Sequence, residues 1–312
     1  MPDNFVIAAS YEHCRKVARS AAKNFYYGFR LLPREKHDAL CALYAFMRGA
    51  DDISDSPGDL EEKRRRLAKR RAEMDRALAG DFSADPVWPA FRHSVERFGI
   101  PPRYFHDLIS GTEMDLTVET YETFERLREY CYRVAGTVGL CCVHVFGFSD
   151  PCVPELAESL GIAFQLTNIL RDIPRDLELG RTYIPGEDLA RFGLSSLART
   201  AECRSKFRAL MEFEADRAWD FYRRGWPLLS LVSEDSRAAL WALARIYSGI
   251  LEKIEARAYD VFSPPAARLS AGEKIWILAR ARLGLRDHNH ELGNRDSDRR
   301  RAGGTFLRRR AG

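Results

Sequence analysis

Two groups of aspartates stand out as residues that could bind a metal ion. The first group closes the segment 41–55, which reads CALYAFMRGADDISD. On an ideal helix this segment is apolar all round except for one narrow stripe, whose members fall within about 60° of one another. They are Tyr44, Arg48, Asp51 and Asp55, with Asp52 a little to the side.

A helix that is apolar on most sides is normally buried, so this stripe should face the interior of the protein. Buried carboxylates are tolerated only when they are paired or bind a cation. Three aspartates with a single arginine leave an excess of negative charge. Mg²⁺ meets that excess, because it prefers a few carboxylate oxygens together with water and substrate phosphates. The sequence therefore predicts a magnesium site here, with Asp51 and Asp55 as ligands.

The second group ends the segment 157–176, which reads AESLGIAFQLTNILRDIPRD. Its polar residues again align, within about 80° of arc, on a helix that is otherwise apolar; they are Gln165, Asn168, Asp172 and Asp176. Either group alone could be a solvated helix end, but two such stripes favour a shared cavity. Facing each other, they would hold a polyphosphate from both sides through bound metal ions. We expect Arg48, Arg171 and Arg181 to neutralise phosphate oxygens that the metals do not reach.

The elements that must position these stripes are helices. Apolar residues recur at the three- and four-residue steps typical of helices through 7–31, 36–56, 59–79, 86–98, 122–147, 153–173, 201–224 and 235–260. Short breakers rich in Pro and Gly separate these segments, and we find no alternating strand pattern and no internal repeat. We therefore expect an all-α fold with a single domain over residues 1–286. In residues 287–312 Gly, Arg, Asp and Asn replace apolar residues, which predicts a disordered basic tail.

Composition narrows the class of protein. The chain of 312 residues is 46% hydrophobic and 30% charged, as is usual for soluble globular proteins. No apolar run approaches the roughly 20 residues of a spanning helix, and the first residues lack a signal-peptide layout, so we expect a cytoplasmic protein. The seven cysteines are odd in number and show no C-x-x-C spacing, which favours reduced core thiols over disulfides or a zinc site.

The net charge of +4 is concentrated near the C-terminus, where residues 295–312 contain seven arginines and two aspartates. This run lacks interleaved aromatics and a folded reading element, so we expect no nucleic acid as a partner. We interpret it as a solvated tail that prefers an anionic membrane surface, which allows peripheral contact at the inner membrane surface. The preceding segment 273–285 could also rest on a bilayer, although burial in the core is the favoured alternative. Its apolar residues are Ile275, Trp276, Ile277, Leu278 and Leu283.

The two acidic stripes belong to longer motifs that resemble the squalene/phytoene synthase family. The resemblance covers residues 11–283 and is carried by NFYYGFRLLP at 24–33, ALYAFMRGADDISD at 42–55, YCYRVAGTVG at 130–139 and FQLTNILRDIPRDLELGRTYIP at 164–185. The last segment is the most specific, because it combines Q-x-x-N-x-x-R-D-x-x-x-D with G-R-x-Y-x-P. The resemblance implies an isoprenoid-synthase-type helical bundle around a central hydrophobic cavity, with both aspartate motifs at its mouth.

The same resemblance implies roles for individual residues. The catalytic metal-binding motifs would be Asp51, Asp52, Asp55, Asp172 and Asp176, and we add Asn168 to the expected ligands. The diphosphate sites would be lined by Tyr44, Arg48, Gln165, Asn168 and Arg171. Tyr130 and Tyr247 are similar to tyrosines near the reacting centre, and Phe25 and Phe29 to aromatics facing the prenyl chains. Small residues would either let a prenyl tail approach their helix or permit close helix packing; they are Val134, Gly136, Val138 and Gly139.

The implied reaction is the Mg²⁺-dependent ionisation of one allylic diphosphate and attack of the carbocation on the C2–C3 double bond of a second. The cyclopropylcarbinyl diphosphate ionises again; NADPH reduction then yields squalene, whereas proton loss yields phytoene or dehydrosqualene. We favour two farnesyl diphosphates as substrates, giving presqualene diphosphate or squalene. Phytoene synthase, acting on two geranylgeranyl diphosphates, and dehydrosqualene synthase are the alternatives. Mg²⁺ is the expected cofactor, NADPH only in the squalene case, and no specific protein partner is predicted.

Two alternatives come from other classes of protein. A class I terpene cyclase or head-to-tail prenyltransferase shares the aspartate clusters, but the Q-x-x-N-x-x-R-D motif and the paired tyrosines argue against it. A non-catalytic isoprenoid-binding subunit should have lost aspartates, whereas this chain keeps all five.

Some residues depart from the family pattern. Ala22 and Asn24 stand where many relatives have serines, and Pro264-Pro265 where relatives usually carry arginines. Pro174 lies inside the second acidic motif, where we expect it to kink the helix and alter how Asp172 and Asp176 share a metal. Outside these motifs we interpret the isolated histidines as structural; they are His93, His106 and His144. For Glu113 and Asp115 we predict salt bridges to nearby arginines rather than catalysis.

Overall fold

The chain forms helices throughout the parts that the structure describes, residues 4–82, 84–197 and 203–284. In the computed structural model the helices are α1 (Asn4–Ala21), α2 (Lys23–Phe29), α3 (Arg34–Asp55), α4 (Leu60–Ala79), α5 (Trp88–Phe98), α6 (Arg103–Met114), α7 (Phe124–Cys131), the π-helical turn η1 (Tyr132–Gly136), α8 (Thr137–Phe146), α9 (Val153–Glu178), α10 (Gly186–Arg191), α11 (Arg204–Gly225), α12 (Leu228–Leu231), α13 (Glu234–Ala256) and α14 (Ala271–Arg282). Among these residues there is no strand, only the isolated bridges Thr120–Thr182 and Phe148–Val232. The all-α prediction is confirmed.

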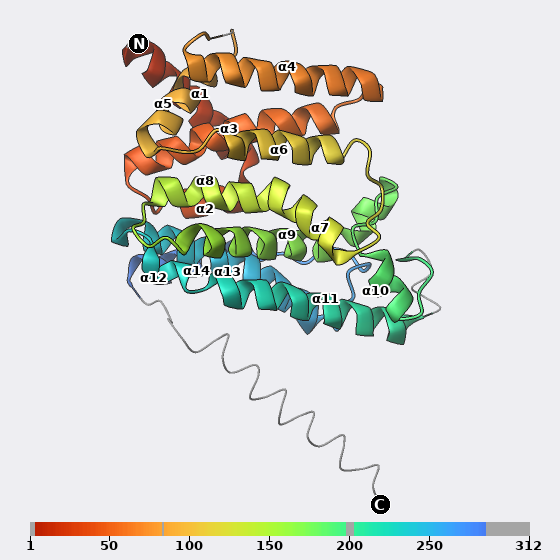
Figure 1. Ribbon diagram of the computed structural model, residues 1–312. Helices are drawn as coiled ribbons and strands as arrows, with labels where there is room; N and C mark the ends of the chain where they lie inside the picture. The colour runs from red at the N-terminus through yellow and green to blue at the C-terminus, as the bar shows by residue number, and fades with distance from the viewer. Residues whose placement is uncertain (1–3, 83, 198–202, 285–312) are drawn as a thin grey trace, which may run out of the picture.

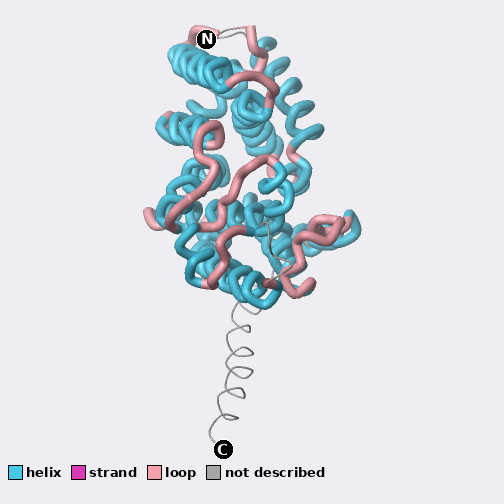
Figure 2. The backbone as a smooth tube through the Cα atoms, turned by 90° about the vertical axis from the view of Figure 1, so that its right-hand side faces the viewer, coloured by secondary structure: helices cyan, strands magenta, loops and turns pink. Residues whose placement is uncertain are grey.

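The long helices lie side by side in one bundle (Figure 1) and are seen nearly end-on after a quarter turn (Figure 2). α9 lies inside the bundle and packs against η1, α8, α11 and α13. α3 lies on the other side of α8 and also packs against α1, α5 and α6. The two helices that carry the aspartate motifs are therefore separated by α8, with α13 and α2 closing the space between them.

Local sequence explains where α3 ends. Pro57 disfavours the helical conformation of the residue before it, and Ser56 is extended, with ψ 153°. Gly58 then adopts φ +139°, a conformation that side chains rarely permit. The helix therefore stops at Asp55, and its last turns carry the first aspartate motif.

α9 differs from the prediction at its C-terminal end. We expected a helix over 153–173 with a disturbance at Pro174, but α9 continues through Pro174 to Glu178. The proline removes one backbone donor, and the many other contacts of this buried helix keep it continuous. Asp172 and Asp176 therefore lie on the same helix, one turn apart, and Gly180 follows with φ +74°.

Other boundaries also departed from the apolar pattern. The predicted helix 7–31 is split at Ala22, which is buried but has ψ 23°. The predicted helix 122–147 contains η1, and α6 and α14 were not among the predicted segments. The repeat of apolar residues continues across a bulge or a single non-helical residue, so periodicity alone does not reveal such breaks.

η1 and α8 approach α9 so closely that only glycine fits at their contacts. A Cβ atom on Gly139 would lie 2.5 Å from the carbonyl oxygen of Ala157, and one on Gly161 would lie 2.3 Å from that of Ala135. The packing alternative for the small residues of 134–139 is thus confirmed at Gly139.

The segment near the C-terminus differs from the favoured interpretation. Ile277 is buried and Leu278 is half-buried, but Ile275, Trp276 and Leu283 are exposed. The expected burial in the core is therefore wrong for these three residues. No helix among the described residues is long and apolar enough to cross a membrane. The predicted tail 287–312 lies outside the described residues.

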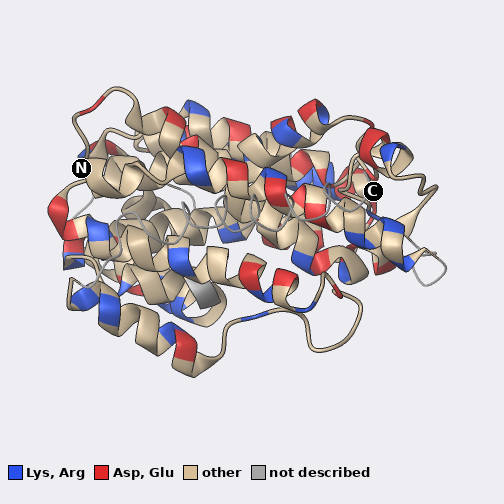
Figure 3. Ribbon diagram, turned by 90° about the horizontal axis from the view of Figure 1, so that it is seen from below, with Lys and Arg blue, Asp and Glu red and all other residues tan. Residues whose placement is uncertain are grey.

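The distribution of charge and the state of the cysteines can be compared with what the composition predicted. In the view from below, basic and acidic residues are interspersed along the helices rather than gathered by sign (Figure 3). All seven cysteines lie in the described ranges and none is disulfide-bonded. Four are buried, Cys14, Cys41, Cys131 and Cys141, whereas Cys152 is exposed, so the expectation of core thiols is wrong for that residue.

Candidate active site

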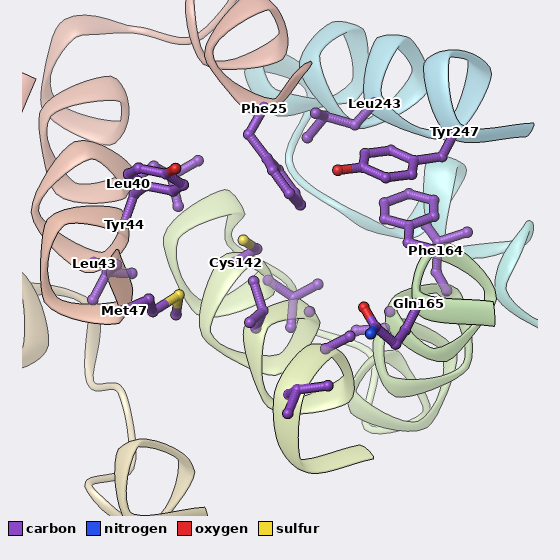
Figure 4. Close-up of a pocket in the computed structure, with 18 of the residues that line it drawn as sticks. Phe25, Leu40, Leu43, Tyr44, Met47, Cys142, Phe164, Gln165, Leu243 and Tyr247 are labelled. Atoms are coloured by element: carbon purple, nitrogen blue, oxygen red, sulfur yellow. The ribbon is translucent and has the colours of Figure 1, made fainter. Parts of the chain in front are cut away.

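A deep apolar cavity lies between α2, α3, α6, η1, α8, α9, α12 and α13 (Figure 4). It contains about 1140 Å³ of empty space, part of which is open solvent at its mouth. Ten of the predicted site residues line it: Phe25, Phe29, Tyr44, Asp51, Val134, Val138, Gly139, Gln165, Asn168 and Tyr247. The structure adds lining residues that we did not predict, among them Leu40, Leu43, Met47, Cys142, Phe164 and Leu243.

The direction of α3 and α9 places the polar lining residues at one end of the cavity and the apolar ones at the other. On α3 the lining runs from Asp51 back to Leu40, which is about 16 Å along the axis. On α9 it runs from Asn168 back to Ala157, the same length. Both motifs lie near the C-terminal ends of their helices, so the aspartates share the mouth. The apolar end is lined by Leu40, Phe146, Ala157, Leu228 and Leu240.

Aromatic rings line the middle of the cavity. Tyr247 stacks on Phe164, with 4.4 Å between ring centroids and 11° between the planes. Phe25 lies 5.4 Å from the Tyr247 ring and tilted against it, and the three rings lie together on one side of the cavity, opposite Tyr44 and Met47 (Figure 4). Their electron-rich faces suit a positively charged intermediate.

Of the three carboxylates of the first motif, one forms an ion pair within the described part of the chain and two do not. Asp52 forms an ion pair with Arg48, with 2.5 Å between the charged atoms. Asp51 borders the cavity, and burial together with the Asp55 charge raises its pKa to about 7. Asp51, Asp52 and Asp55 are all exposed, so the expectation that these carboxylates face the interior is wrong. Asp51 borders the open mouth of the cavity, and protein atoms surround its carboxylate on the other sides.

The second motif repeats this arrangement. Asp172 receives two hydrogen bonds from the guanidinium of Arg171, at 2.8 and 2.5 Å. Burial and the Asp172 charge raise the pKa of Asp176 to about 6. Neither Arg171 nor these two aspartates lines the cavity itself, so they form its outer rim.

Asp115 is a site residue that the sequence interpretation missed. We predicted a salt bridge, as Glu113 indeed forms with Arg71 at 3.0 Å. The Asp115 carboxylate instead accepts hydrogen bonds from the hydroxyls of Tyr130, at 3.1 Å, and Tyr183, at 2.9 Å.

Arg181 donates to the backbone carbonyl of Asp115 at 2.9 Å. Burial raises the pKa of Asp115, and its charge contributes to the raised pKa values of Asp51 and Asp176. Asp115 therefore lies between the two motifs. Its place in the stretch GTEMDL, just past the end of α6, was the only sequence signal for it.

Tyr130 lies beside the cavity rather than in its wall. It is buried and forms a ring cluster with Tyr121 and Tyr183, at centroid distances of 5.5 and 5.2 Å. The hydroxyl of Tyr121 is buried and has no hydrogen-bond partner among the described residues. The remaining predicted residues outside the lining are Arg48, Asp52, Asp55 and Arg181, which lie at the mouth near the aspartates.

The mouth suits magnesium ions that are shared with a substrate. Among the described residues no three His, Cys, Asp or Glu side chains come close enough to hold one ion by themselves. In the same part of the chain Asp51, Asp55 and Asp176 form no ion pair with a basic side chain, and two of them have raised pKa values. Mg²⁺ keeps several waters and binds through one or two carboxylates plus phosphate oxygens, so an incomplete protein ligand set fits it.

Comparison with known proteins agrees with this geometry. The family model of squalene/phytoene synthase matches residues 18–273. The chain is 37% identical over 269 residues to 15-cis-phytoene synthase of Synechococcus elongatus, covering 82% of this chain and 87% of that protein. It is 39% identical over 279 residues to phytoene synthase of Mycobacterium bovis, covering 88% of this chain and 91% of that protein.

Two solved structures are also similar. A dehydrosqualene synthase crystallised with a ligand has a TM-score of 0.79 at 31% identity, covering 89% of this chain and 97% of that one. The squalene synthase HpnC from Alicyclobacillus acidocaldarius has a TM-score of 0.75 at 31% identity, covering 81% and 95%. The terpene cyclase alternative is thereby set aside. The chain belongs to the squalene/phytoene synthase family, whose members are prenyltransferases that condense two prenyl diphosphates head to head.

Proposed function

We propose that this protein is a phytoene synthase, which joins two geranylgeranyl diphosphates. The observation that carries the proposal is the match to proteins named phytoene synthase at 37–39% identity over at least 82% of the chain. The similar proteins named dehydrosqualene or squalene synthase are 31% identical. These comparisons support the geranylgeranyl alternative better than the farnesyl substrate that we favoured from sequence.

The length of the cavity supports long prenyl chains. Its lining runs about 16 Å along α3, from Asp51 at the mouth to Leu40 at the inner end. Its inner end is lined by apolar side chains, so long prenyl tails would gain from burial there.

We assign the charged residues at the mouth to the diphosphates. Mg²⁺ would be held by Asp51, Asp55, Asp172 and Asp176, with Asn168 as a further ligand and Asp52 beside them, and would neutralise the leaving diphosphate. Arg48, Arg171 and Arg181 would neutralise the remaining oxygens, and Tyr44 and Gln165 would bind the same groups. Positive charge kept at the mouth favours departure of the diphosphate over capture of the cation.

The carbon chemistry takes place deeper in the cavity. The allylic cation bonds to the C2–C3 double bond of the second substrate and, after proton loss, gives a cyclopropylcarbinyl diphosphate. Loss of the second diphosphate and rearrangement precede a final loss of a proton. Phe25, Phe164 and Tyr247 would stabilise the cations through their ring faces, while the apolar lining excludes water. We place Tyr130 behind the cavity wall, where its hydroxyl donates to Asp115, and Phe29, Val134, Val138 and Gly139 along the tails.

These reaction steps balance without a reductant. Two geranylgeranyl diphosphates yield phytoene, two diphosphates and protons, so NADPH is not required. Only a squalene product would consume NADPH.

A second candidate is dehydrosqualene synthase, because a structure of that name is similar with a TM-score of 0.79. It differs only in using farnesyl diphosphate. The two candidates can be separated by substrate preference. A non-catalytic isoprenoid-binding subunit would turn over neither substrate.

The decisive experiment incubates the purified full-length protein with each diphosphate and Mg²⁺, with and without NADPH, and identifies the products by chromatography and mass spectrometry. We expect phytoene from geranylgeranyl diphosphate, independent of NADPH and lost when Mg²⁺ is chelated. A strong preference for farnesyl diphosphate, or a squalene product that needs NADPH, would overturn the proposal.

Location and organisation follow as proposals. We propose a cytoplasmic enzyme whose catalytic domain spans residues 1–286, followed by a basic tail, with peripheral contact to the inner membrane surface. The family match to residues 18–273 lies within that domain and supports it.

A further inference from the structure

α14 presents an apolar stripe to solvent. Ile275 is 61% exposed, Trp276 is 58% exposed and Leu283 is 73% exposed. On an ideal helix these residues fall within about 100° of arc, together with the exposed Gly272 and Ala279. Large apolar side chains gathered on one exposed face usually mark an interaction surface.

Arginines border this stripe on both sides. By helical position Arg282 lies about 20° beyond Ile275, and Arg280 lies about 40° beyond Trp276. The guanidinium of Arg280 lies over the Trp276 ring, 4.6 Å from its centroid. Exposed apolar residues that include a tryptophan, with arginines beside them, suit contact with a membrane interface.

The opposite face holds α14 firmly on the protein. Ile277 and Ala281 are buried where α14 packs on α13. At its start Ser270 and Glu273 form a capping box, and Lys253 of α13 pairs with Glu273 at 2.7 Å. The exposed stripe is therefore presented by a fixed helix.

The position of α14 connects this surface with the cavity. α14 packs against α2, and Lys274 lies over the Tyr27 ring at 5.4 Å. α2 also carries Phe25 and Phe29, which line the cavity. α14 therefore packs on two helices, α2 and α13, that both line the space that would hold the prenyl chains.

We propose that the stripe Gly272–Ile275–Trp276–Ala279–Leu283, with Arg280 and Arg282, docks on an anionic lipid surface. Charge complementarity selects this occupant, because arginines border the apolar residues and residues 295–312 add seven more. An apolar contact combined with a polybasic segment is what reversible membrane binding requires. The proposal rests on the proposed function only for the reason why a membrane is useful, namely that substrate and product are lipids.

The test uses full-length protein and vesicles of phosphatidylcholine, with or without an equal amount of phosphatidylglycerol. We expect co-sedimentation with the anionic vesicles at low salt and weaker binding at high salt. The emission of Trp276 should shift to the blue on binding, and Trp276→Phe should abolish that shift. The double substitution Ile275→Ser, Leu283→Ser should weaken partitioning by about tenfold or more.

Two controls separate the stripe from general effects. Phe5 is 78% exposed on α1, at the other end of the bundle (Figure 1), so Phe5→Ser should leave vesicle binding unchanged. The charge variant Arg280→Gln, Arg282→Gln should lower binding and its dependence on salt. None of these residues lines the cavity, so turnover in detergent should be unaffected.

The proposal is overturned if wild-type protein ignores anionic vesicles at low salt, or if the serine variant binds as wild type does. It is also overturned if the serine variant lowers the oligomeric mass in sedimentation velocity, since a second copy of the chain would then cover the stripe. Vesicle binding is measured without substrate, so its failure is distinct from a failure of the proposed reaction.

Discussion

The aspartates at the mouth differ in whether an arginine already pairs with them. Arg48 pairs with Asp52 and Arg171 with Asp172. Asp51 has no such partner among the described residues and carries a raised pKa. A bound cation should therefore interact most favourably with Asp51 and Asp176, because no basic side chain in the described part of the chain pairs with either carboxylate.

Asp51→Asn should lower turnover by about a hundredfold or more, because the group that stabilises the leaving charge is lost. Removing a desolvated charge should leave the fold intact, as measured by thermal unfolding. Asp172→Asn should act alike on turnover. The exposed Asp81, outside the site, provides the control Asp81→Asn, which should behave as wild type; near-normal activity in both site variants would refute the metal assignment.

The affinity for Mg²⁺ should fall as the pH drops from about 8 to about 6. The pKa values of Asp51, about 7, and Asp176, about 6, both lie above the ordinary value, so protons compete with the metal in this window. A carboxyl with a raised pKa in the folded state loses its stabilising effect as the pH rises. Without Mg²⁺, the free energy of unfolding should therefore decrease between about pH 4 and pH 7 through these groups. Titration of Mg²⁺ by calorimetry at several pH values tests this, and a pH-independent affinity would contradict it.

Tyr183→Phe should lower kcat, whereas Tyr121→Phe should have little effect. Tyr183 donates a hydrogen bond to Asp115, but the Tyr121 hydroxyl has no partner in the described part of the chain. Both rings belong to the same cluster, so the pair isolates the hydroxyl. Equal kcat values for the two variants would show that the Asp115 contact has no role in turnover.

The helices bring these side chains together at one end of the cavity. α3 and α9 each end in an aspartate motif, and the close contact of α8 with α9 sets one wall of the cavity. That contact depends on glycine, because a backbone carbonyl occupies the space that a side chain would need.

Gly139→Ala should destabilise the protein by about 1–3 kcal/mol, because its Cβ would lie 2.5 Å from the carbonyl oxygen of Ala157, a backbone atom that moves only with the helix. Denaturant unfolding measures this through the midpoint at constant slope. The control is Gly272→Ala on α14, where the nearest atom is 4.0 Å away, so that alanine should be neutral or slightly stabilising. Equal stability of the two variants would refute close packing at Gly139.

The whole molecule encloses the cavity and thereby limits chain length. Tyr247 and Leu240 both line it from α13, and Leu240 lies seven residues further from the mouth, about 10 Å along the axis. The inner end is therefore a tertiary feature, assembled from α3, α8, α9, α12 and α13.

Leu240→Ala should raise the kcat/KM ratio for a longer over a shorter prenyl diphosphate by about tenfold, because space opens at the inner end. Leu251→Ala is the matched control, since Leu251 is fully buried on the same helix and does not line the cavity. Both variants lose core packing, but only the first should change the ratio. An unchanged ratio in Leu240→Ala would show that residues other than Leu240 limit the length of the prenyl chain.

Periodicity predicted most of the fold, but it was blind to single residues that leave the helical conformation. Ala22 keeps its place in the apolar pattern while breaking the helix, and Pro174 was expected to disturb a helix that in fact continues. Burial of α9 on several sides outweighs the loss of one backbone hydrogen bond. Local propensity is a weak guide wherever tertiary packing is extensive.

The sequence by itself determined the helical class and the two aspartate stripes, because a regular spacing places side chains on one face of a helix without reference to the rest of the chain. It also carried the motifs that pointed to the family. Only the tertiary structure showed that Asp115 lies between the motifs, that Tyr130 lies outside the cavity wall and that Trp276 is exposed. Each of those facts depends on contacts between residues far apart in the chain, which spacing along one helix does not encode.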